Sequence, residues 1–83
     1  MKVTVKYFAS IREALGTPDE TLESSAPTLG ALRDELIARG SRYAEVLARG
    51  RAVRVALNQS LSAESAVLVD GCEVAFFPPV TGG

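Results

Sequence analysis

Two stretches near the ends of the chain, KVTVKYF at residues 2–8 and CEVAFF at residues 72–77, decide the fold. Side chains in both alternate with a period of two, which is typical of a strand with one face against a core. Pro78 and Pro79 end the second stretch, because proline cannot donate to a strand ladder. We therefore expect two half-buried strands. Their core-facing residues are expected to be Val3, Val5 and Tyr7 in the first strand, and Cys72, Val74 and Phe76 in the last.

The main helix is predicted between these two strands. Thr28 can cap its N-terminus, and Gly40 can end it. Its core-facing residues, at helical spacing, are Leu29, Leu32, Leu36 and Ile37.

Shorter elements fill the rest of the chain. Ser10 and Glu13 have the spacing of a capping box, which predicts a helix over residues 10–15 that ends at Gly16. Residues 41–48 are expected to add one or two helical turns. Weaker patterns predict strands at 20–24, at 53–58 and briefly around Leu61, and Asp70-Gly71 predicts a turn.

The order of these elements indicates an α+β domain whose helices cover one face of a sheet. A single main helix favours the ubiquitin-like β-grasp architecture. A ferredoxin-like sandwich is the alternative, and it would require two long helices. Because no linker or repeat divides the chain, we expect one domain over residues 1–83, with residues 78–83 as an extended C-terminal tail.

Composition excludes several kinds of chemistry. The 83 residues include no histidine and one cysteine, so the chain lacks a histidine base and cannot form an internal disulfide or a four-cysteine metal site. Nine Lys and Arg residues balance ten Asp and Glu residues, which leaves no basic excess for nucleic acid. We find neither a signal-peptide pattern nor a run of roughly 20 apolar residues. We expect a cytoplasmic protein without a metal, nucleic-acid or membrane partner.

Two phenylalanines break the alternation of their strands. Phe8 is in phase with Lys2 and Lys6, and Phe77 is in phase with Glu73. If those faces are solvated, both rings are exposed, and they lie close together because the first and last strands of a β-grasp sheet are neighbours. An exposed apolar patch usually marks an interaction surface. The alternative is that each ring closes an edge of the core.

The predicted tail, PPVTGG, has features suited to acyl chemistry. Six extended residues span about 20 Å, and Pro78-Pro79 favours extended geometry. Gly82 and Gly83 lack Cβ atoms and can pass through a narrow channel, although frayed termini also often contain glycine. The carboxylate of Gly83 is the least hindered acyl group of the chain. Adenylation by ATP in a partner would activate it, and a sulfur nucleophile could then displace AMP.

The segment DGCEVAFFPPVTGG at residues 70–83 closely resembles the C-terminus of the small, sulfur-carrying subunit of molybdopterin synthase. The segment VKYFASIREALG at 5–16 resembles that family's FFA-x-x-RE-x-x-G motif. T-x-x-x-L-R-x-x-L at 28–36 and VALNQSL at 55–61 add to the match, so the resemblance spans essentially the whole chain.

The resemblance implies a β-grasp fold and a reaction cycle with two partners. An E1-like activating enzyme would use ATP to adenylate Gly83, and sulfur would then be installed as a thiocarboxylate. The tail would insert into the large subunit of the synthase, which holds most of the catalytic site, and donate sulfur to cyclic pyranopterin monophosphate. Two donations build the dithiolene of molybdopterin. The synthase resembled is a heterotetramer, and no cofactor is expected on the chain itself. The inserted residues would be Pro78, Pro79, Val80, Thr81 and Gly82.

The resemblance also assigns surface positions. Phe8, Leu61 and Phe77 match apolar positions of the partner-facing surface. Arg12 matches an arginine that would contact the activating enzyme, and the alternative is a solvated helix side chain. Cys72 stands where the family more often has an acidic residue, and we expect it to be a neutral strand residue.

Two other functions remain open at this stage. One is a sulfur carrier for the thiazole of thiamin or for tRNA thiolation, although thiazole-pathway carriers are usually shorter and lack the FFPPVTGG ending. The other is a ubiquitin-like binding module, or a modifier attached to lysines. A binding module should tolerate loss of Gly83, and a modifier would form high-mass conjugates.

Overall fold

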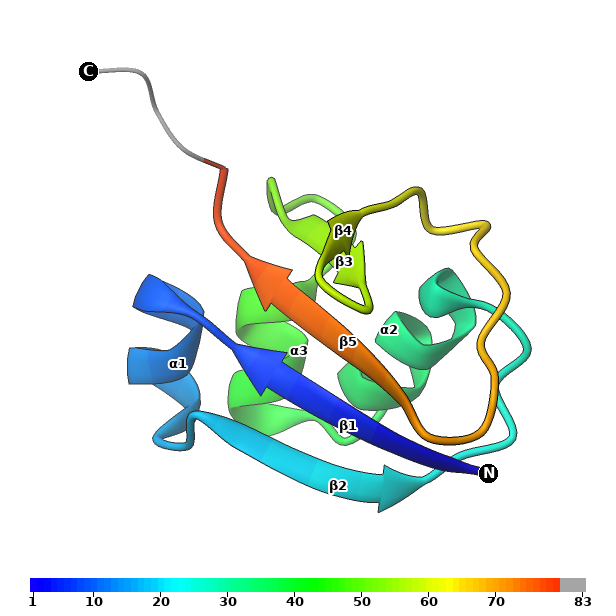
Figure 1. Ribbon diagram of the computed structural model, residues 1–83. Helices are drawn as coiled ribbons and strands as arrows, with labels where there is room; N and C mark the ends of the chain where they lie inside the picture. Colours follow the sequence, from blue (N-terminus) through cyan, green and yellow to red (C-terminus); the bar gives the residue numbers. More distant parts are fainter. Residues whose placement is uncertain (80–83) are drawn as a thin grey trace.

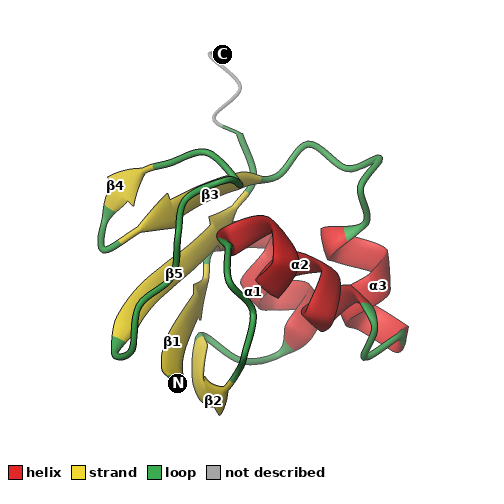
Figure 2. Ribbon diagram, turned by 90° about the vertical axis from the view of Figure 1, so that its right-hand side faces the viewer, coloured by secondary structure: helices red, strands yellow, loops and turns green. Residues whose placement is uncertain are grey.

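The computed structural model describes residues 1–79, which form one five-stranded sheet covered on one face by helices (Figure 1). Figure 2 shows the helices on one side of the sheet and the opposite face left open. The elements are, in chain order, β1 (Lys2–Tyr7), α1 (Ala9–Leu15), β2 (Asp19–Glu23), α2 (Leu29–Ile37), α3 (Ser41–Leu47), β3 (Arg54–Leu57), β4 (Ser60–Leu61) and β5 (Cys72–Phe77).

The strand order is β2-β1-β5-β3-β4, with the first and last strands side by side at the centre. β1 and β5 run parallel, with Val5 opposite Val74, and the other neighbouring pairs are antiparallel. This confirms the β-grasp prediction. The ferredoxin-like alternative is wrong, because the helices other than α2 within residues 1–79, α1 and α3, have seven residues each.

The core lies between the sheet and the helices. The residues predicted to face it from β1 and β5 are all buried, and so is the stripe of α2 except for Ile37, which is half-buried. Burying each such apolar side chain contributes about 1.5–3 kcal/mol. The largest fully buried side chains are Tyr7, Phe76, Leu29, Leu32, Leu36, Leu47, Val3, Val5 and Val74.

The boundaries of α2 follow from its caps. The hydroxyl of Thr28 accepts a hydrogen bond from the backbone N–H of Ala31 at 3.2 Å, as predicted for an N-cap. The helix ends at Ile37, and its C-cap is Ala38 and not the predicted Gly40. Gly40 is instead the N-cap of α3, with a φ of 76°, which a residue with a Cβ rarely adopts. The chain turns there directly into α3.

The predicted capping box of α1 is wrong. The helix begins one residue earlier than expected, its N-cap is Phe8, and no side chain caps it. The backbone N–H of Phe8 donates to the carbonyl of Phe76 at 3.1 Å, which holds Phe8 against the end of β5. Pairing with β5 therefore decides where β1 stops, and Ser10 falls inside the helix. The stop at Gly16 is confirmed by its φ of 74° and its bond to the carbonyl of Arg12.

Smaller corrections concern the ends of other elements. β2 covers Asp19–Glu23, so it starts and ends one residue earlier than predicted. Ser24 is outside the strand, and its hydroxyl donates a hydrogen bond to the carboxylate of Glu35. β3 is shorter than predicted because Asn58 and Gln59, with φ of 49° and 70°, form a two-residue hairpin turn into β4. α3 ends at Leu47, one residue earlier than predicted.

Only the first two residues of the predicted C-terminal tail lie within the described part of the chain. Pro78 and Pro79 follow β5 outside any strand, as expected. The rest of the predicted tail, Val80, Thr81, Gly82 and Gly83, lies outside the described residues. None of the helices in residues 1–79 has the length and apolar character that crossing a membrane requires.

Candidate functional site

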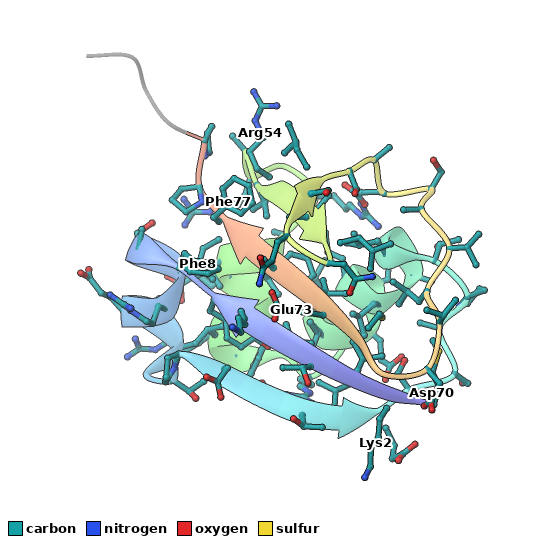
Figure 3. The ribbon with its side chains drawn as sticks, in the orientation of Figure 1. Lys2, Phe8, Arg54, Asp70, Glu73 and Phe77 are labelled. Atoms are coloured by element: carbon teal, nitrogen blue, oxygen red, sulfur yellow. The ribbon has the colours of Figure 1, made fainter. Side chains whose placement is uncertain are left out.

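The face of the sheet left open by the helices carries an apolar patch at one end, which faces the viewer in Figure 3. We call it the open-face patch. Strand pairing assembles it, since Ala56 lies opposite both Ala75 of β5 and Leu61 of β4. Residues opposite one another in a sheet project from the same face. The patch consists of Phe8, Ala56, Leu61, Ala75 and Phe77.

The larger side chains of the patch are open to solvent to different degrees. Leu61 is 67% exposed and Phe8 is 44% exposed, while Phe77 is half-buried. The prediction that both phenylalanines lie on the open face is confirmed, although Phe77 is more covered than expected. Ala56 and Ala75 are buried and have small side chains, so the surface between the larger side chains is recessed.

The orientation of Phe8 has a backbone cause. Its N–H bond to the carbonyl of Phe76 extends the pairing of β1 with β5 by one residue. Phe8 therefore stays in phase with Lys6 and points away from the core. Ala9 then takes a φ of 51° and turns the chain into α1. Moving the helix start by one residue would remove this outward orientation.

Charged side chains surround the open-face patch. Lys6 forms an ion pair with Glu73 at 3.4 Å on the open face. Arg54 lies directly opposite Phe77, and Arg12 lies on α1 four residues after Phe8. Both guanidinium groups are exposed, and neither has a hydrogen bond or ion pair to residues 1–79.

The root of the tail adjoins the open-face patch, because Pro78 and Pro79 directly follow Phe77 (Figure 3). A groove of about 420 Å³ reaches Pro78 from the other side, between α1 and α3. A second hollow of about 420 Å³ is shared by Arg54 and Leu61. The predicted acyl carrier Gly83 lies outside the described residues, so geometry constrains only where its tail starts.

Sequence reasoning missed the burial of Arg33, which ties α2 to the segment before β3 and to the loop after β4. Arg33 of α2 is 3% exposed. Its guanidinium donates to the carbonyls of Leu47 and Ala48, each at 2.8 Å, and to the carboxylate of Glu64 at 3.0 Å. These bonds fix the segment that leads into β3 and the loop that follows β4. The sequence did contain a signal for this burial. Arg33 follows Leu32 directly and lies four residues after Leu29, which places it on the apolar side of the helix.

A second polar cluster fastens β2 to the helices. The carboxylate of Glu20 accepts hydrogen bonds from the hydroxyls of Tyr7 at 2.9 Å and Tyr43 at 2.7 Å, and from Arg39 at 2.9 Å. Burial raises the pKa of Glu20, but these three donors outweigh it and hold the pKa below its usual value. Burial, together with the hydrogen bond to Glu20, raises the pKa of Tyr7. The cluster lies on the helix side of the sheet and has a structural role.

The remaining polar groups offer little for a cofactor. Cys72 is a free thiol, 2% exposed and on the core side of β5, in agreement with its expected role as a strand residue. Within residues 1–79, no group of three or more Cys, Asp or Glu side chains is arranged to hold a metal ion.

A β-grasp sheet with an exposed apolar patch beside the root of a Gly-Gly ending defines the class of ubiquitin-like proteins. The ThiS family model matches residues 5–83. The chain is 43% identical over 81 residues to the molybdopterin synthase sulfur carrier subunit of Escherichia coli (strain K12). This match covers 98% of this chain and 99% of that protein. It therefore belongs to the ThiS family and, within it, to the sulfur carrier subunits of molybdopterin synthase.

Solved structures support the same fold. SAMP1 from Haloferax volcanii matches with a TM-score of 0.80 and 25% identity, over 100% of both chains. The complex of subunits 1 and 2 of the molybdopterin-converting factor from Helicobacter pylori contains a chain that matches with a TM-score of 0.69 and 27% identity, again over 100% of both chains.

Proposed function

We propose that this sulfur carrier subunit bears its sulfur on the C-terminal carbonyl of Gly83 and delivers it while docked through the open-face patch. The observation that carries the proposal is that the tail starts immediately after Phe77, a residue of the patch. A partner that covers the patch is thereby close to the root of the tail. Docking then restricts where the tip can reach, which raises its effective concentration in the partner's active site.

The proposed chemistry has two stages. In the first, a carboxylate oxygen of Gly83 attacks the α-phosphate of ATP on an E1-like enzyme, and pyrophosphate leaves. A sulfur nucleophile then attacks the acyl adenylate, AMP leaves, and a thiocarboxylate remains. Activation is needed because a free carboxylate is a poor acyl donor. ATP is bound by the activating enzyme in this scheme, and the carrier itself holds no cofactor.

In the second stage, the tail enters the active site of the large synthase subunit. The thiocarboxylate sulfur attacks a carbon of cyclic pyranopterin monophosphate, and an oxygen substituent of that carbon leaves with the electron pair of the broken C–O bond. Water then cleaves the resulting acyl–sulfur bond, which leaves the sulfur on the substrate and returns the carboxylate of Gly83. Two such donations complete the dithiolene. The carrier is not catalytic on its own, and acid–base groups are supplied by the partner. The solved Helicobacter pylori complex of subunits 1 and 2 supports a direct contact between the two kinds of subunit.

The residues have distinct parts in this proposal. Phe8, Leu61 and Phe77 anchor the carrier on a partner, and Arg12 contacts the activating enzyme. Pro78 and Pro79 direct the tail away from the sheet, while Val80, Thr81 and Gly82 pass through the partner's channel. We place the reaction in the cytoplasm, where the free thiol of Cys72 would stay reduced.

Deletion of Gly83 tests the proposal. The truncated chain should fold with unchanged thermal stability, because residues 1–79 already contain the sheet and its core. It should acquire no sulfur in intact-mass measurements with the activating enzyme, and it should support no molybdopterin synthesis with the large subunit. The matched control is Val67→Ala, which shortens an exposed side chain outside the open-face patch and the tail and keeps the terminal carboxylate.

Molybdopterin formation by the truncated chain would contradict the proposal. High-mass conjugates of the full-length chain in its native host, without a thiocarboxylate form, would indicate a modifier instead.

A further inference from the structure

Arg54 is an exposed cation beside the open-face patch whose acidic neighbours are already paired. It lies opposite Phe77 at the edge of the patch and shares a hollow with Leu61 and Glu64. Glu64 is engaged by Arg33 at 3.0 Å and also by Arg49. Among the described residues 1–79, Arg54 itself has no ion pair or side-chain hydrogen bond.

The next acid along the open face is also occupied. The carboxylate of Glu73 on β5 pairs with Lys6 at 3.4 Å, and the backbone N–H of Glu73 donates to the side-chain oxygen of Asn58 at 3.0 Å. Glu73 is the second residue of β5, while Arg54 and Phe77 lie together at the end of the sheet from which the tail leaves (Figure 3). Within residues 1–79, the fold therefore presents a positive charge without an ion pair next to the open-face patch.

We propose that Arg54 is a specificity residue for the partner that receives the tail, and that it pairs with a carboxylate on that partner's surface. The inference rests on the proposed function, since it assumes that the large synthase subunit covers the patch. Covering Phe77 and Leu61 removes water from the adjacent guanidinium. An unpaired cation in such a place is costly, and a bidentate carboxylate offsets the lost hydration.

This arrangement selects for one kind of partner surface. The partner needs an apolar area for the patch and an acidic side chain at the edge nearest the tail root. A partner with a neutral or basic edge would leave Arg54 desolvated and unpaired. The cost of that mismatch weakens binding of the wrong partner more than the ion pair strengthens binding of the right one. The pair would also fix the rotation of the carrier on its partner, and so direct the tail.

The test measures the affinity of the full-length carrier for the large synthase subunit of the same organism. Arg54→Gln is expected to weaken binding about two- to fivefold, and Arg54→Glu about tenfold or more at low salt. The difference between wild type and Arg54→Glu should shrink in about 1 M salt, where the Debye length is about 3 Å.

Lys2→Glu is the matched control. Lys2 is an exposed cation on the same face, at the opposite end of the sheet from Arg54 (Figure 3). The same charge reversal there should change the affinity less than twofold. If both reversals weaken binding equally, general charge and not a local pair is responsible, and the inference is wrong.

Another variant separates failure of this inference from failure of the proposed function. Wild-type affinity of Arg54→Glu, with binding weakened by Phe77→Ala, would overturn the role of Arg54 and leave the docking surface in place. If Arg54→Glu and Phe77→Ala both bound like wild type, the open-face patch would not be the docking surface, and both proposals would fail.

Discussion

Truncation of Phe8 should weaken docking by an amount that its exposure predicts. The residue is 44% exposed in the free carrier. An aromatic side chain can bury about 200 Å², so complete coverage by a partner would remove roughly 90 Å² of apolar surface from water. At about 25 cal/mol per Å² this is about 2 kcal/mol, or about thirtyfold in Kd. We therefore expect Phe8→Ala to raise the Kd for the large subunit by that factor.

The assay is isothermal titration of the carrier with the large subunit, with thermal denaturation of both carriers to confirm that the fold is retained. The control is Val67→Ala. Val67 is 69% exposed, but it is bridged to Thr28 beside α2 and is separate from the open-face patch. Its truncation should leave the Kd within about twofold of wild type. Equal affinities for Phe8→Ala and wild type, or equal losses for both variants, would refute the reasoning.

Two further predictions concern stability. Arg33→Met should lower the free energy of unfolding by about 2–4 kcal/mol in urea titrations, because it leaves the carbonyls of Leu47 and Ala48 without their donor, at about 1–3 kcal/mol for each unsatisfied group; Arg12→Met is the exposed control, and equal small losses in both would contradict this role. Because the pKa of Glu20 is lowered in the folded state, its contribution to stability is complete above its unfolded pKa, near 4.5, and is lost as the pH falls through the folded value. The stability difference between wild type and Glu20→Gln should therefore shrink on acidification below about pH 4.5; a constant difference down to pH 2 would contradict the pKa assignment.

Local patterns predicted most of the fold correctly. Alternation identified β1 and β5 because side chains on a strand project to opposite faces with a fixed period. The cap at Thr28 could be recognised because its hydroxyl bonds to Ala31, only three residues away. The capping prediction for α1 failed because a distant segment competes with the local one. Ser10 has the spacing of a cap, but the bond between Phe8 and Phe76 starts the helix before it.

The candidate site divides in the same way. The phase break at Phe8 and at Phe77 was visible in the sequence, and so was the unusual ending. Arg33 was missed because its partners are backbone carbonyls at 47 and 48, and any residue type supplies a backbone carbonyl. A residue pattern therefore cannot point to them. No sequence pattern marks Arg54, since its position beside Phe77 depends on the pairing of β3 with β5.

By itself, the sequence determined the periodic faces of the elements, the N-cap of the main helix and a C-terminal ending suited to acyl transfer, because each depends on residues close together in the chain. Only the tertiary structure decided which outward-facing residues become neighbours. Phe8 and Phe77 are 69 positions apart, and they meet because β1 and β5 exchange backbone hydrogen bonds at the centre of the sheet. Those bonds depend on strand order, which is set by burial of the whole core and has no local signature.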